Sequence, residues 1–495
     1  MMRSSTLLLL TGLSALAGTA SAQSVSFSNY TSYSMGQLCG PSAVAATDIN
    51  GDGKPDIITA NSYNNTVGVL LNNGNGTFPT PATMYPNGGT SAYMGGLAKT
   101  GIAVADLDGD GHPDVLMANS GSNTVSVLKG SSTGTLQAPT TYSTGSSSQP
   151  YSVVLADMNG DGHPDILTPN YNSTKVGVLL GNSNGTFQPV AEYATGTTSG
   201  PKRLAVADVN GDGNPDVLTV NGTNAVRILL GNGNGTLQTA TTYTTGMATV
   251  DGITVADVTG DGQADLLLAG SNSSFAGVVG VLPGAGTGTF QPGSTYLSAG
   301  GPPSRIVVAD VNQDGLPDLV TTNVDGSANN LTGSSLNVLL GNGIGTFKAA
   351  LAYGVGGKYN PLDVAVADVN TDGRPDLICA HYQANWILVS ANATPLAARA
   401  TLPGTTATLH PNPASTSTAL SLAGLPATVA QVQATLFDAT GRAVGQQQLA
   451  AAQGTARAEV PTAGLAAGLY VLRLTAYDAL GQPAGSLPAQ RLSIR

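Results

Sequence analysis

The chain has 495 residues, of which only 9% are charged, and its net charge is −11 at pH 7. The scarcity of charge argues against coiled coils and helical bundles, and the 65 glycines favour an all-β protein rich in tight turns. The acidic balance argues against a nucleic-acid-binding protein, because such proteins contact phosphate through clustered Lys and Arg.

Residues 1–22 have the pattern of a secretory signal peptide. A basic residue, Arg3, precedes the apolar stretch Leu7–Ala17, which is too short to span a bilayer, and Ala20–Ala22 fits the small-residue cleavage rule. We therefore predict an exported protein whose mature chain begins at Gln23. No later stretch has 18 apolar residues, so no transmembrane segment is expected.

One acidic phrase, Asp-x-Asn-x-Asp-Gly-x-x-Asp or a close variant, recurs seven times along the chain. Its copies begin at Asp48, Asp106, Asp157, Asp208, Asp257, Asp310 and Asp368. A β-like run (strand A) precedes each copy and another (strand B) follows it. A Val/Leu-rich run (strand C), a Gly-rich turn and a Tyr-centred run (strand D) complete the repeat. Four strands in about 50 residues match one blade of a propeller, so we predict an all-β, seven-bladed β-propeller over residues 23–395.

The two ends of this array look like complementary parts of one repeat. Phe or Leu precedes the strand-D Tyr by six residues in most repeats, and Phe27 and Tyr33 have the same spacing. Trp386–Val389 resembles a strand C with no strand D after it. We predict that a strand near residues 25–35 completes the last blade and closes the ring, which removes exposed sheet edges.

The chain has two cysteines, Cys39 and Cys379, which fall in the first and last blades. These blades are neighbours in a closed ring, and an exported protein can oxidise its thiols. A disulfide that reinforces closure is therefore one hypothesis, and two free thiols are the alternative.

Each acidic phrase has the pattern of a cation-binding loop. Oxygen atoms at positions 1, 3, 5 and 9 can converge on one hard cation, and Gly at position 6 permits the sharp turn. Position 7 varies freely, which suggests that only its backbone carbonyl is used, and position 2 is always apolar, which fits a packed side chain. Position 12 lacks the acid of an EF-hand and the following residues are strand-like, which excludes that motif.

The loops hold 22 of the 29 carboxylates in the chain. Oxygen-only ligands in an irregular loop favour Ca²⁺ over Zn²⁺ or Cu²⁺, so up to seven structural calcium ions are predicted. The predicted metal ligands, with position 7 acting through its carbonyl, are Asp48, Asn50, Asp52, Lys54, Asp56; Asp106, Asp108, Asp110, His112, Asp114; Asp157, Asn159, Asp161, His163, Asp165; Asp208, Asn210, Asp212, Asn214, Asp216; Asp257, Thr259, Asp261, Gln263, Asp265; Asp310, Asn312, Asp314, Leu316, Asp318; and Asp368, Asn370, Asp372, Arg374, Asp376.

The phrases at residues 206–216 (VADVNGDGNPD) and 229–237 (LLGNGNGTL) resemble the FG-GAP/VCBS repeat family. That family includes the integrin α-chain propeller and several lectin propellers. The resemblance covers about three-quarters of the chain and implies a propeller with Ca²⁺ in the loops between strands A and B. It implies no particular ligand, because the family hosts many functions.

A linker at 396–406 precedes a tail of different composition at 407–495. Alternating apolar residues and regularly spaced turns predict a small antiparallel β-sandwich there. Pro-Asn-Pro at 411–413, Gly-Arg at 441–442 and Gly-Leu-Tyr at 468–470 are similar to the C-terminal sorting domain of type IX secretion cargo. This resemblance implies contact with the type IX machinery, export across a Gram-negative outer membrane, and release or attachment at the surface. An ordinary adhesive sandwich domain is the alternative.

Strand direction divides the propeller into two faces. The acidic loops and the turns between strands C and D share one face, and the loops between strands B and C share the other with the connections from D to A. The second face carries the ligand-binding candidates, which are aromatic residues among Asn and Ser: Tyr63, Tyr93, Tyr171, Phe275 and Tyr382.

We predict a monomeric, secreted or surface-attached module that binds glycans or extracellular proteins. A polysaccharide lyase or hydrolase on the same scaffold and a structural surface-layer protein are the alternatives. The enzyme is disfavoured because nearly all carboxylates are assigned to metal and only one of the four histidines, His381, is expected on the binding face. Asp251, Asp325 and Asp363 are among the few carboxylates left over.

Overall fold

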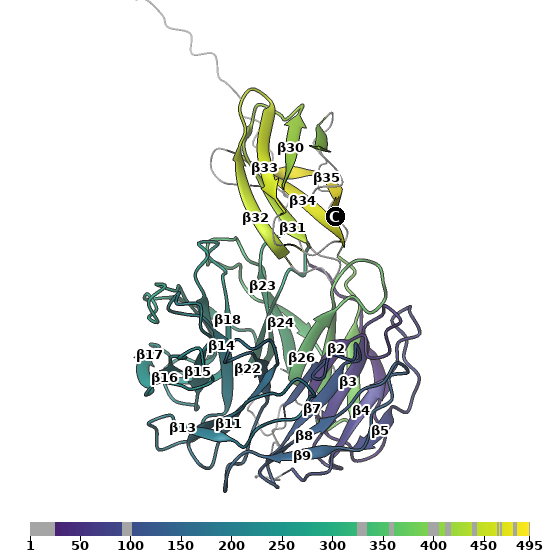
Figure 1. Cartoon of the computed structure of the whole chain (residues 1–495), viewed down its shortest axis with the longest axis vertical. Helices are drawn as coiled ribbons and strands as arrows, with labels where there is room; N and C mark the ends of the chain where they lie inside the picture. Colours follow the sequence, from purple (N-terminus) through teal and green to yellow (C-terminus); the bar gives the residue numbers. More distant parts are fainter. Residues whose placement is uncertain are drawn as a thin grey trace, which may run out of the picture. The chain divides into compact units, whose positions relative to one another are not determined.

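The computed structural model of the chain describes residues 25–91, 101–323, 334–355, 361–394, 405–410, 417–437, 443–462, 465, 468–478 and 483–494. Every regular element within these ranges is a β-strand, and none of the described residues belongs to a helix that could cross a membrane. The chain divides into two compact units, Met1–Thr394 and Pro395–Arg495 (Figure 1). The predicted signal peptide and Tyr93 lie outside the described residues.

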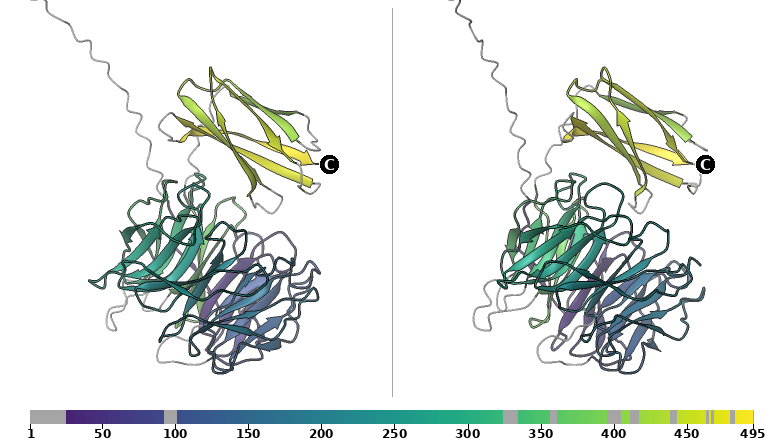
Figure 2. Two further views of the ribbon diagram at one scale, coloured as in Figure 1. Left: turned by 60° about the vertical axis from the view of Figure 1, so that its left-hand side comes forward. Right: turned by 90° about the vertical axis from the view of Figure 1, so that its left-hand side faces the viewer.

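The first unit consists of repeated four-stranded antiparallel sheets, one for each acidic phrase, which we number 1 to 7 (Figures 1 and 2). Sheets 1 to 3 are β2 (Pro41–Thr47), β3 (Asp56–Asn61), β4 (Thr66–Leu70) and β5 (Thr83–Pro86); β6 (Ile102–Ala105), β7 (Asp114–Asn119), β8 (Thr124–Leu128) and β9 (Thr140–Ser143); and β10 (Val154–Ala156), β11 (Asp165–Asn170), β12 (Lys175–Leu179) and β13 (Ala191–Ala194).

Sheets 4 to 6 repeat this order of four consecutive strands. They are β14 (Arg203–Ala207), β15 (Asp216–Val220), β16 (Ala225–Leu229) and β17 (Thr241–Thr244); β18 (Thr249–Ala256), β19 (Asp265–Ser271), β20 (Gly277–Leu282) and β21 (Ser294–Leu297); and β22 (Pro303–Ala309), β23 (Asp318–Asn323), β24 (Ser335–Leu339) and β25 (Leu351–Gly354). The all-β class and the four-stranded antiparallel repeat are as the sequence predicts.

Sheet 7 takes its fourth strand from the other end of the chain. It contains β26 (Pro361–Ala367), β27 (Asp376–His381), β28 (Trp386–Ser390) and β1 (Thr31–Ser34), in the order β1-β28-β27-β26. Tyr33 lies opposite Ile387 in this pairing, and an additional bridge joins Phe27 to Asn392. The N-terminal segment therefore completes the sheet of the last repeat.

Strand B is buried along its whole length because a neighbouring sheet covers each of its faces. In β7, Val115 and Met117 pack with residues of sheet 1, whereas Leu116 and Ala118 pack with residues of sheet 3. Successive side chains of a strand point to opposite faces, so one strand serves two cores. This double burial explains why strand B is a continuous apolar run in the sequence rather than an alternating one.

Edge-to-face aromatic pairs join neighbouring sheets, and the series continues through the two ends of the array. The Tyr of strand D packs against the Phe that follows strand C in the next sheet, with ring centroids 5.0–5.7 Å apart. Tyr353 of sheet 6 contacts Phe27 of the N-terminal segment, and Tyr33 of β1 contacts Phe78 of sheet 1. The two aromatic residues that are six apart in the sequence therefore do not contact each other, and each packs against a different neighbouring sheet.

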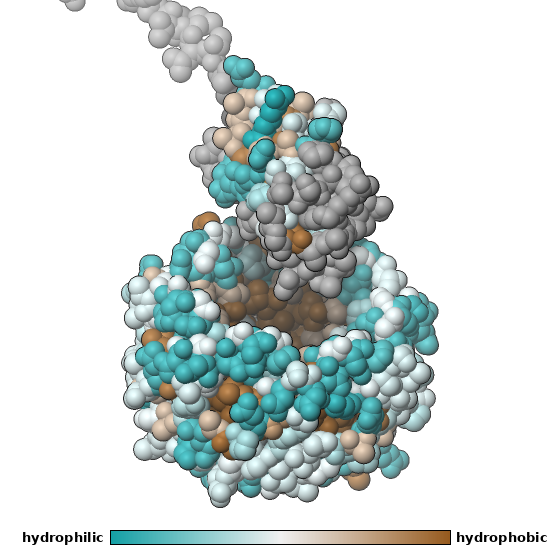
Figure 3. Space-filling model, viewed as in Figure 1, coloured by the Kyte–Doolittle hydropathy of each residue, from teal (hydrophilic) through white to brown (hydrophobic). Residues whose placement is uncertain are grey.

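The first strands of the seven sheets also contact one another in order, from β2 and β6 round to β22 and β26, and β26 contacts β2. The space-filling view shows that this unit is hollowed, with apolar residues inside the hollow and hydrophilic residues around it (Figure 3). The first strands are therefore the innermost strands of the unit.

The two cysteines do not form a disulfide, so that hypothesis is wrong. Both thiols are free and buried. Cys39 packs with residues of sheets 7 and 1, and its Sγ lies 2.9 Å from the carbonyl oxygen of Met35. Cys379 points to the opposite side of sheet 7 and packs with residues of sheet 6. The two thiols lie in adjacent sheets but in separate cores.

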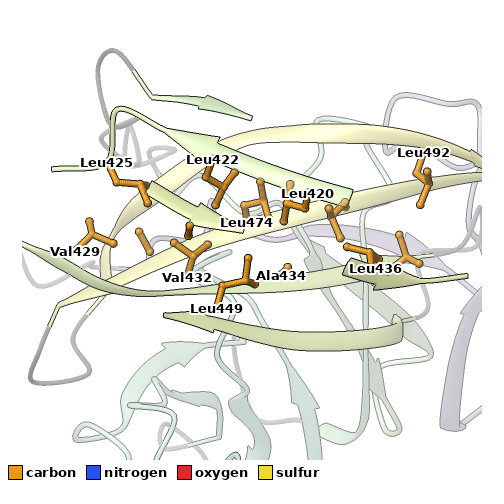
Figure 4. Close-up of a cluster of buried hydrophobic side chains, with 14 of the residues drawn as sticks. Leu420, Leu422, Leu425, Val429, Val432, Ala434, Leu436, Leu449, Leu474 and Leu492 are labelled. Carbon is orange, nitrogen blue, oxygen red and sulfur yellow. The ribbon is translucent and has the colours of Figure 1, made fainter. Parts of the chain in front are cut away.

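The second unit is a small antiparallel β-sandwich. One sheet contains β29 (Thr406–His410), β30 (Ser417–Ala423) and β33 (Thr455–Pro461), and the other contains β32 (Ala443–Ala450), β31 (Val429–Phe437), β34 (Gly468–Asp478) and β35 (Pro483–Ile494). Leu420 and Leu422 from the first sheet meet Val432, Leu436 and Leu474 from the second in one apolar core (Figure 4). Burial of this shared face holds the two sheets together.

Candidate functional site

The backbone of each acidic loop holds the loop's own carboxylates in place. The Gly N–H at position 6 donates to Oδ2 of the position-1 Asp in all seven loops, at 2.7–2.8 Å. The N–H at position 7 donates to Oδ1 of the position-5 Asp at 2.8–3.0 Å. The glycine at position 6 has φ of 82–87° throughout, which favours glycine. The loops therefore wrap around their acidic side chains.

Besides its predicted role as a metal ligand, the carboxylate at position 9 has a structural role that sequence reasoning missed. It is buried in every loop and links the loop to the segment that follows strand C. Its Oδ2 accepts the N–H of position 2 at 2.7–3.1 Å. Its Oδ1 accepts an N–H of the segment after strand C at 2.7–2.8 Å, which is the C–D turn in sheets 1 to 6 and Asn392 in sheet 7. The apolar side chains at position 2 are buried, as predicted.

Burial of the position-9 carboxylate makes its ionisation unfavourable. Burial raises the pKa of Asp56 and Asp376 to about 6 and that of Asp318 to about 7. The carboxylates at positions 1 and 5 of the same loops raise these pKa values further, whereas the two backbone N–H donors lower them. A cation among the loop carboxylates would oppose both effects that raise the pKa.

The donor geometry of the acidic loop that begins at Asp106, which we call loop 2, fits a hard cation. Asp106, Asp108 and Asp114 each offer a carboxylate oxygen, and these three oxygens lie within 4.8 Å of one another. Carboxylate oxygens are the ligands that Ca²⁺ prefers. Asp108 stands where the other loops have Asn or Thr, and Lys129 Nζ lies 2.6 Å from its Oδ2. This contact lowers the pKa of Asp108 and raises that of Lys129, so the lysine offsets the additional charge.

Side chains at position 7 interact with the surface of the loops. Lys54 and Arg374 form ion pairs with the position-5 carboxylates Asp52 and Asp372, at 3.3 and 2.8 Å. The variation of this position in the sequence agrees with such peripheral roles. The use of its backbone carbonyl as a metal ligand stays a prediction.

The aromatic candidates are placed differently from one another. Phe275 is 79% exposed and Tyr63 is 39% exposed, so both lie on the surface. Tyr171 is half-buried, and its ring stacks on that of Tyr151 at a centroid distance of 4.4 Å and an angle of 9°. Tyr93 lies outside the described residues. Of the candidates described, Phe275 is the most accessible.

Two predictions about the binding face are wrong. Tyr382 is fully buried, because the ring of Tyr63 from sheet 1 packs against it at a centroid distance of 4.7 Å. His381 is also buried, and burial lowers its pKa to about 4, so the imidazole is neutral at physiological pH. Tyr63 and Tyr382 fill the junction between sheets 7 and 1, which the sequence pattern of a single repeat does not reveal.

A pocket of about 240 Å³ opens where the innermost strands begin, at the end of the sheets opposite the acidic loops. We call it the channel mouth. All seven sheets contribute to its lining, through residues at the start of strand A or just before it. One from each sheet, in order, is Ser42, Ile102, Val154, Arg203, Asp251, Arg305 and Asp363. The pocket therefore lies where the innermost strands of all the sheets meet.

Five charged side chains line the channel mouth. Lys202 Nζ lies 2.7 Å from Asp251 Oδ1, and Arg305 Nε lies 2.8 Å from Asp363 Oδ1. The side chain of Arg203 has no hydrogen-bond or ion-pair partner within the described part of the chain. Enclosure by protein and the nearby charge of Arg305 lower the pKa of the half-buried Arg203 to about 10, whereas the carboxylates of Asp363 and Asp251 act in the opposite direction. Its guanidinium therefore remains protonated at neutral pH.

Sequence-based prediction missed this group of residues although a signal was present. Two of the four carboxylates outside the loops in residues 25–394 are Asp251 and Asp363. They stand six and five residues before the first Asp of their loops, and Lys202, Arg203 and Arg305 occupy the same two positions in sheets 4 and 6. Alignment of the repeats on these positions places all five charges at the start of the innermost strands.

FG-GAP-like repeats match residues 48–117, 106–168, 170–219, 208–268, 257–321 and 325–379, and a secretion system C-terminal sorting domain matches residues 408–480. No curated protein matches the chain. Among solved structures, the crystal structure of BBS1N in complex with ARL6DN, soaked with lead, is similar, with a TM-score of 0.48 and 11% identity over 75% of this chain and 98% of that chain. The chain belongs to the FG-GAP-like repeat family and ends in a type IX secretion sorting domain.

Proposed function

We propose that the seven sheets are the blades of one closed propeller, that the acidic loops bind Ca²⁺, and that the exported protein binds glycans or extracellular proteins. The sorting domain makes it a secreted or cell-surface protein of the type IX system. The observation that carries the proposal is that the two ends of the sheets bear different groups of residues. One end has the acidic loops, and the other has the channel mouth and exposed aromatic side chains such as Phe275.

Calcium is assigned a structural role in this proposal. Each loop joins strand A to strand B, and its position-9 carboxylate bonds to the turn that follows strand C. A cation bound there would tie three strands of one sheet together. The loops lie at the opposite end of the innermost strands from the channel mouth, so a bound cation would support the binding site without touching the ligand.

A polysaccharide-active enzyme is the second candidate, because two carboxylates share one pocket, as in most glycoside hydrolases. Asp251 and Asp363 are the residues concerned. Asp251 is paired with Lys202 at 2.7 Å, and Asp363 is paired with Arg305 at 2.8 Å. Asp363 also accepts the backbone N–H of Val44 at 3.2 Å. Neither carboxylate is left to attack a sugar or to protonate a leaving group, so we favour binding over hydrolysis.

The test is a binding screen of the full mature chain on a glycan array and on extracellular matrix proteins, in Ca²⁺ and in EDTA. We expect binding to a defined glycan class or protein in Ca²⁺ and weaker binding in EDTA, because metal loss destabilises the fold. The glycans bound are then incubated with the protein and assayed for new reducing ends or unsaturated products. Cleavage would assign the enzyme, and the absence of any ligand for folded, metal-loaded protein would favour a structural surface-layer role.

A further inference from the structure

We propose that the channel mouth binds an acidic sugar, a ring with several hydroxyl groups and one carboxylate, and that Arg203 pairs with that carboxylate. The inference rests on the proposed glycan-binding function and names its site and ligand class. A uronic acid at the end of a polysaccharide chain has this chemistry.

The charge at the mouth favours a ligand with a single negative charge. Its lining contains three cations and two carboxylates, and the Lys202–Asp251 and Arg305–Asp363 ion pairs use two of the cations. The guanidinium of Arg203 is the remaining positive charge and has no partner within the described residues. A dianion such as sulfate would be opposed by the two carboxylates in the wall, whereas one carboxylate on the ligand balances the charge.

The shape of the guanidinium favours a carboxylate as the anion. Arginine presents a planar fork of N–H donors that matches the two oxygens of a carboxylate, and such bidentate pairs are among the strongest hydrogen bonds in proteins. Enclosure within the protein strengthens this interaction, because fewer water molecules compete for the donors. Arg203 is the first residue of β14, and every residue of this strand pairs with β15. The backbone position of Arg203 is therefore defined before a ligand binds.

The rest of the lining suits the hydroxyl groups and apolar edges of a sugar ring. The lining includes the hydroxyl-bearing residues Ser152, Ser304 and Tyr151, and the two carboxylates can accept hydrogen bonds from sugar hydroxyls. Leu362 and Ile102 supply apolar surface. The volume of about 240 Å³ is below the range of about 300–1,000 Å³ that is usual for drug-sized ligands, so the mouth suits one sugar residue rather than an extended chain segment.

Titration of the full mature chain in Ca²⁺ with D-glucuronate and D-galacturonate, followed by calorimetry or ligand-observed NMR, tests the inference. D-glucose tests the need for the carboxylate, and acetate tests the need for the ring. We expect binding of at least one uronate, no binding of glucose, and weak or no binding of acetate. Arg203→Gln should weaken uronate binding about 10- to 100-fold, the effect expected for losing hydrogen bonds to a charged group. Arg203→Lys should be intermediate, because it keeps the charge and loses the fork.

Lys175→Gln is the matched control, because it also removes one positive charge but lies on β12 in an ion pair with Glu192, away from the mouth. Its uronate affinity should equal that of the unmodified protein, and all variants must share the same melting temperature in Ca²⁺. Equal binding of glucose and glucuronate, or undiminished binding by Arg203→Gln, would overturn the inference. If the protein still binds a glycan on the array in that case, the proposed function stands and its site lies elsewhere. If no ligand binds in either assay, both fail.

Discussion

Asp161 and Asp165 occupy positions 5 and 9 of the same acidic loop but differ in their surroundings. Asp161 is exposed, whereas Asp165 is fully buried and accepts the N–H groups of Met158 and Gly181, each at 2.7 Å. Asp165→Ala should therefore destabilise the protein even in EDTA, by about 1–3 kcal/mol for each buried N–H left without a partner. Thermal unfolding of the variant with and without Ca²⁺ measures this effect.

Asp161→Ala is the control for the metal. In EDTA it should change the melting temperature little, because its side chain is exposed and accepts hydrogen bonds only within its own loop, from the N–H of His163 and the side-chain amide of Asn159. In Ca²⁺ it should lower the melting temperature by weakening the site. Equal losses for both variants in EDTA would show that the buried hydrogen bonds of Asp165 contribute nothing beyond those of an exposed loop residue.

The raised pKa of the position-9 carboxylates predicts a pH dependence for the metal-free protein. Asp56 and Asp376 have a pKa of about 6 in the folded protein, and Asp318 has a pKa of about 7, against about 3.9 for an unfolded Asp. Between these values the folded protein holds protons that the unfolded chain has released, so the folded state loses stability as pH rises from about 4 to about 7. Unfolding experiments in EDTA across this range should show that decline.

Calcium should reverse this trend, because its ligands must be deprotonated. The rise in melting temperature on adding Ca²⁺ should be small at pH 5, where these buried carboxyl groups carry protons, and larger at pH 8. A calcium effect of the same size at both pH values would mean that the position-9 carboxylates do not take part in metal binding.

Residue-level prediction from the sequence succeeded where one repeat contains all the interacting partners. The apolar position 2 and the turn glycine at position 6 are local features, and each is visible in a single copy. Tyr382 was misplaced because the residue that covers it, Tyr63, comes from a sheet more than 300 residues away in the sequence. The charges of the channel mouth were missed for the same reason, since Arg203 and Asp363 belong to different sheets and meet only in the folded protein.

At the level of strands, β1 is the element on which the last sheet depends. It pairs with β28 over four residues, Tyr33 OH donates to the carbonyl of Gly76 in sheet 1 at 2.8 Å, and Tyr353 OH donates to that of Val25. A mature chain lacking residues 23–35 should melt at a lower temperature and aggregate, because the edge of β28 and the cores on both sides become exposed. Thermal unfolding and light scattering measure both effects.

A synthetic peptide of residues 23–35 should restore stability to the truncated chain by adding a strand to the exposed edge. A peptide of the same composition in scrambled order should not, because it lacks the Phe27 and Tyr33 rings in the correct register. A truncated chain that melts at the original temperature would show that β1 contributes nothing to the last sheet. This strand was predictable because Phe27 and Tyr33 are six residues apart, as are the corresponding Phe and Tyr in other repeats.

At the scale of the whole molecule, the second unit should direct export. The sorting domain matches residues 408–480, and the apolar core there is formed by residues of the second unit. In a bacterium with a type IX system, deletion of residues 407–495 should leave the protein inside the outer membrane, and fractionation with immunoblotting measures this. Fusion of the same segment to an unrelated periplasmic protein is the matched gain-of-function control. Export of the truncated chain at the normal level would contradict the prediction.

The charge of the whole chain makes metal removal the most general test. The loops contain 22 of the 29 carboxylates in a chain of net charge −11, and seven Ca²⁺ would add 14 positive charges. Each site that binds only the folded protein adds about 2.7 kcal/mol of stability when free Ca²⁺ is 100 times its Kd. EDTA should therefore lower the melting temperature strongly, and added Ca²⁺ should restore it. Mg²⁺ should restore it less, because Mg²⁺ demands a smaller octahedral site.

Metal analysis of the dialysed protein should find several bound calcium ions per chain, up to seven. Loop 2 provides an internal comparison, because Lys129 already contacts its position-3 carboxylate. Lys129→Gln should leave Asp108 uncompensated, which lowers the melting temperature in EDTA and increases the gain on adding Ca²⁺, since the cation then has one more carboxylate available. An unchanged melting curve in EDTA, with no metal left in the protein, would contradict a structural role for calcium in all seven loops at once.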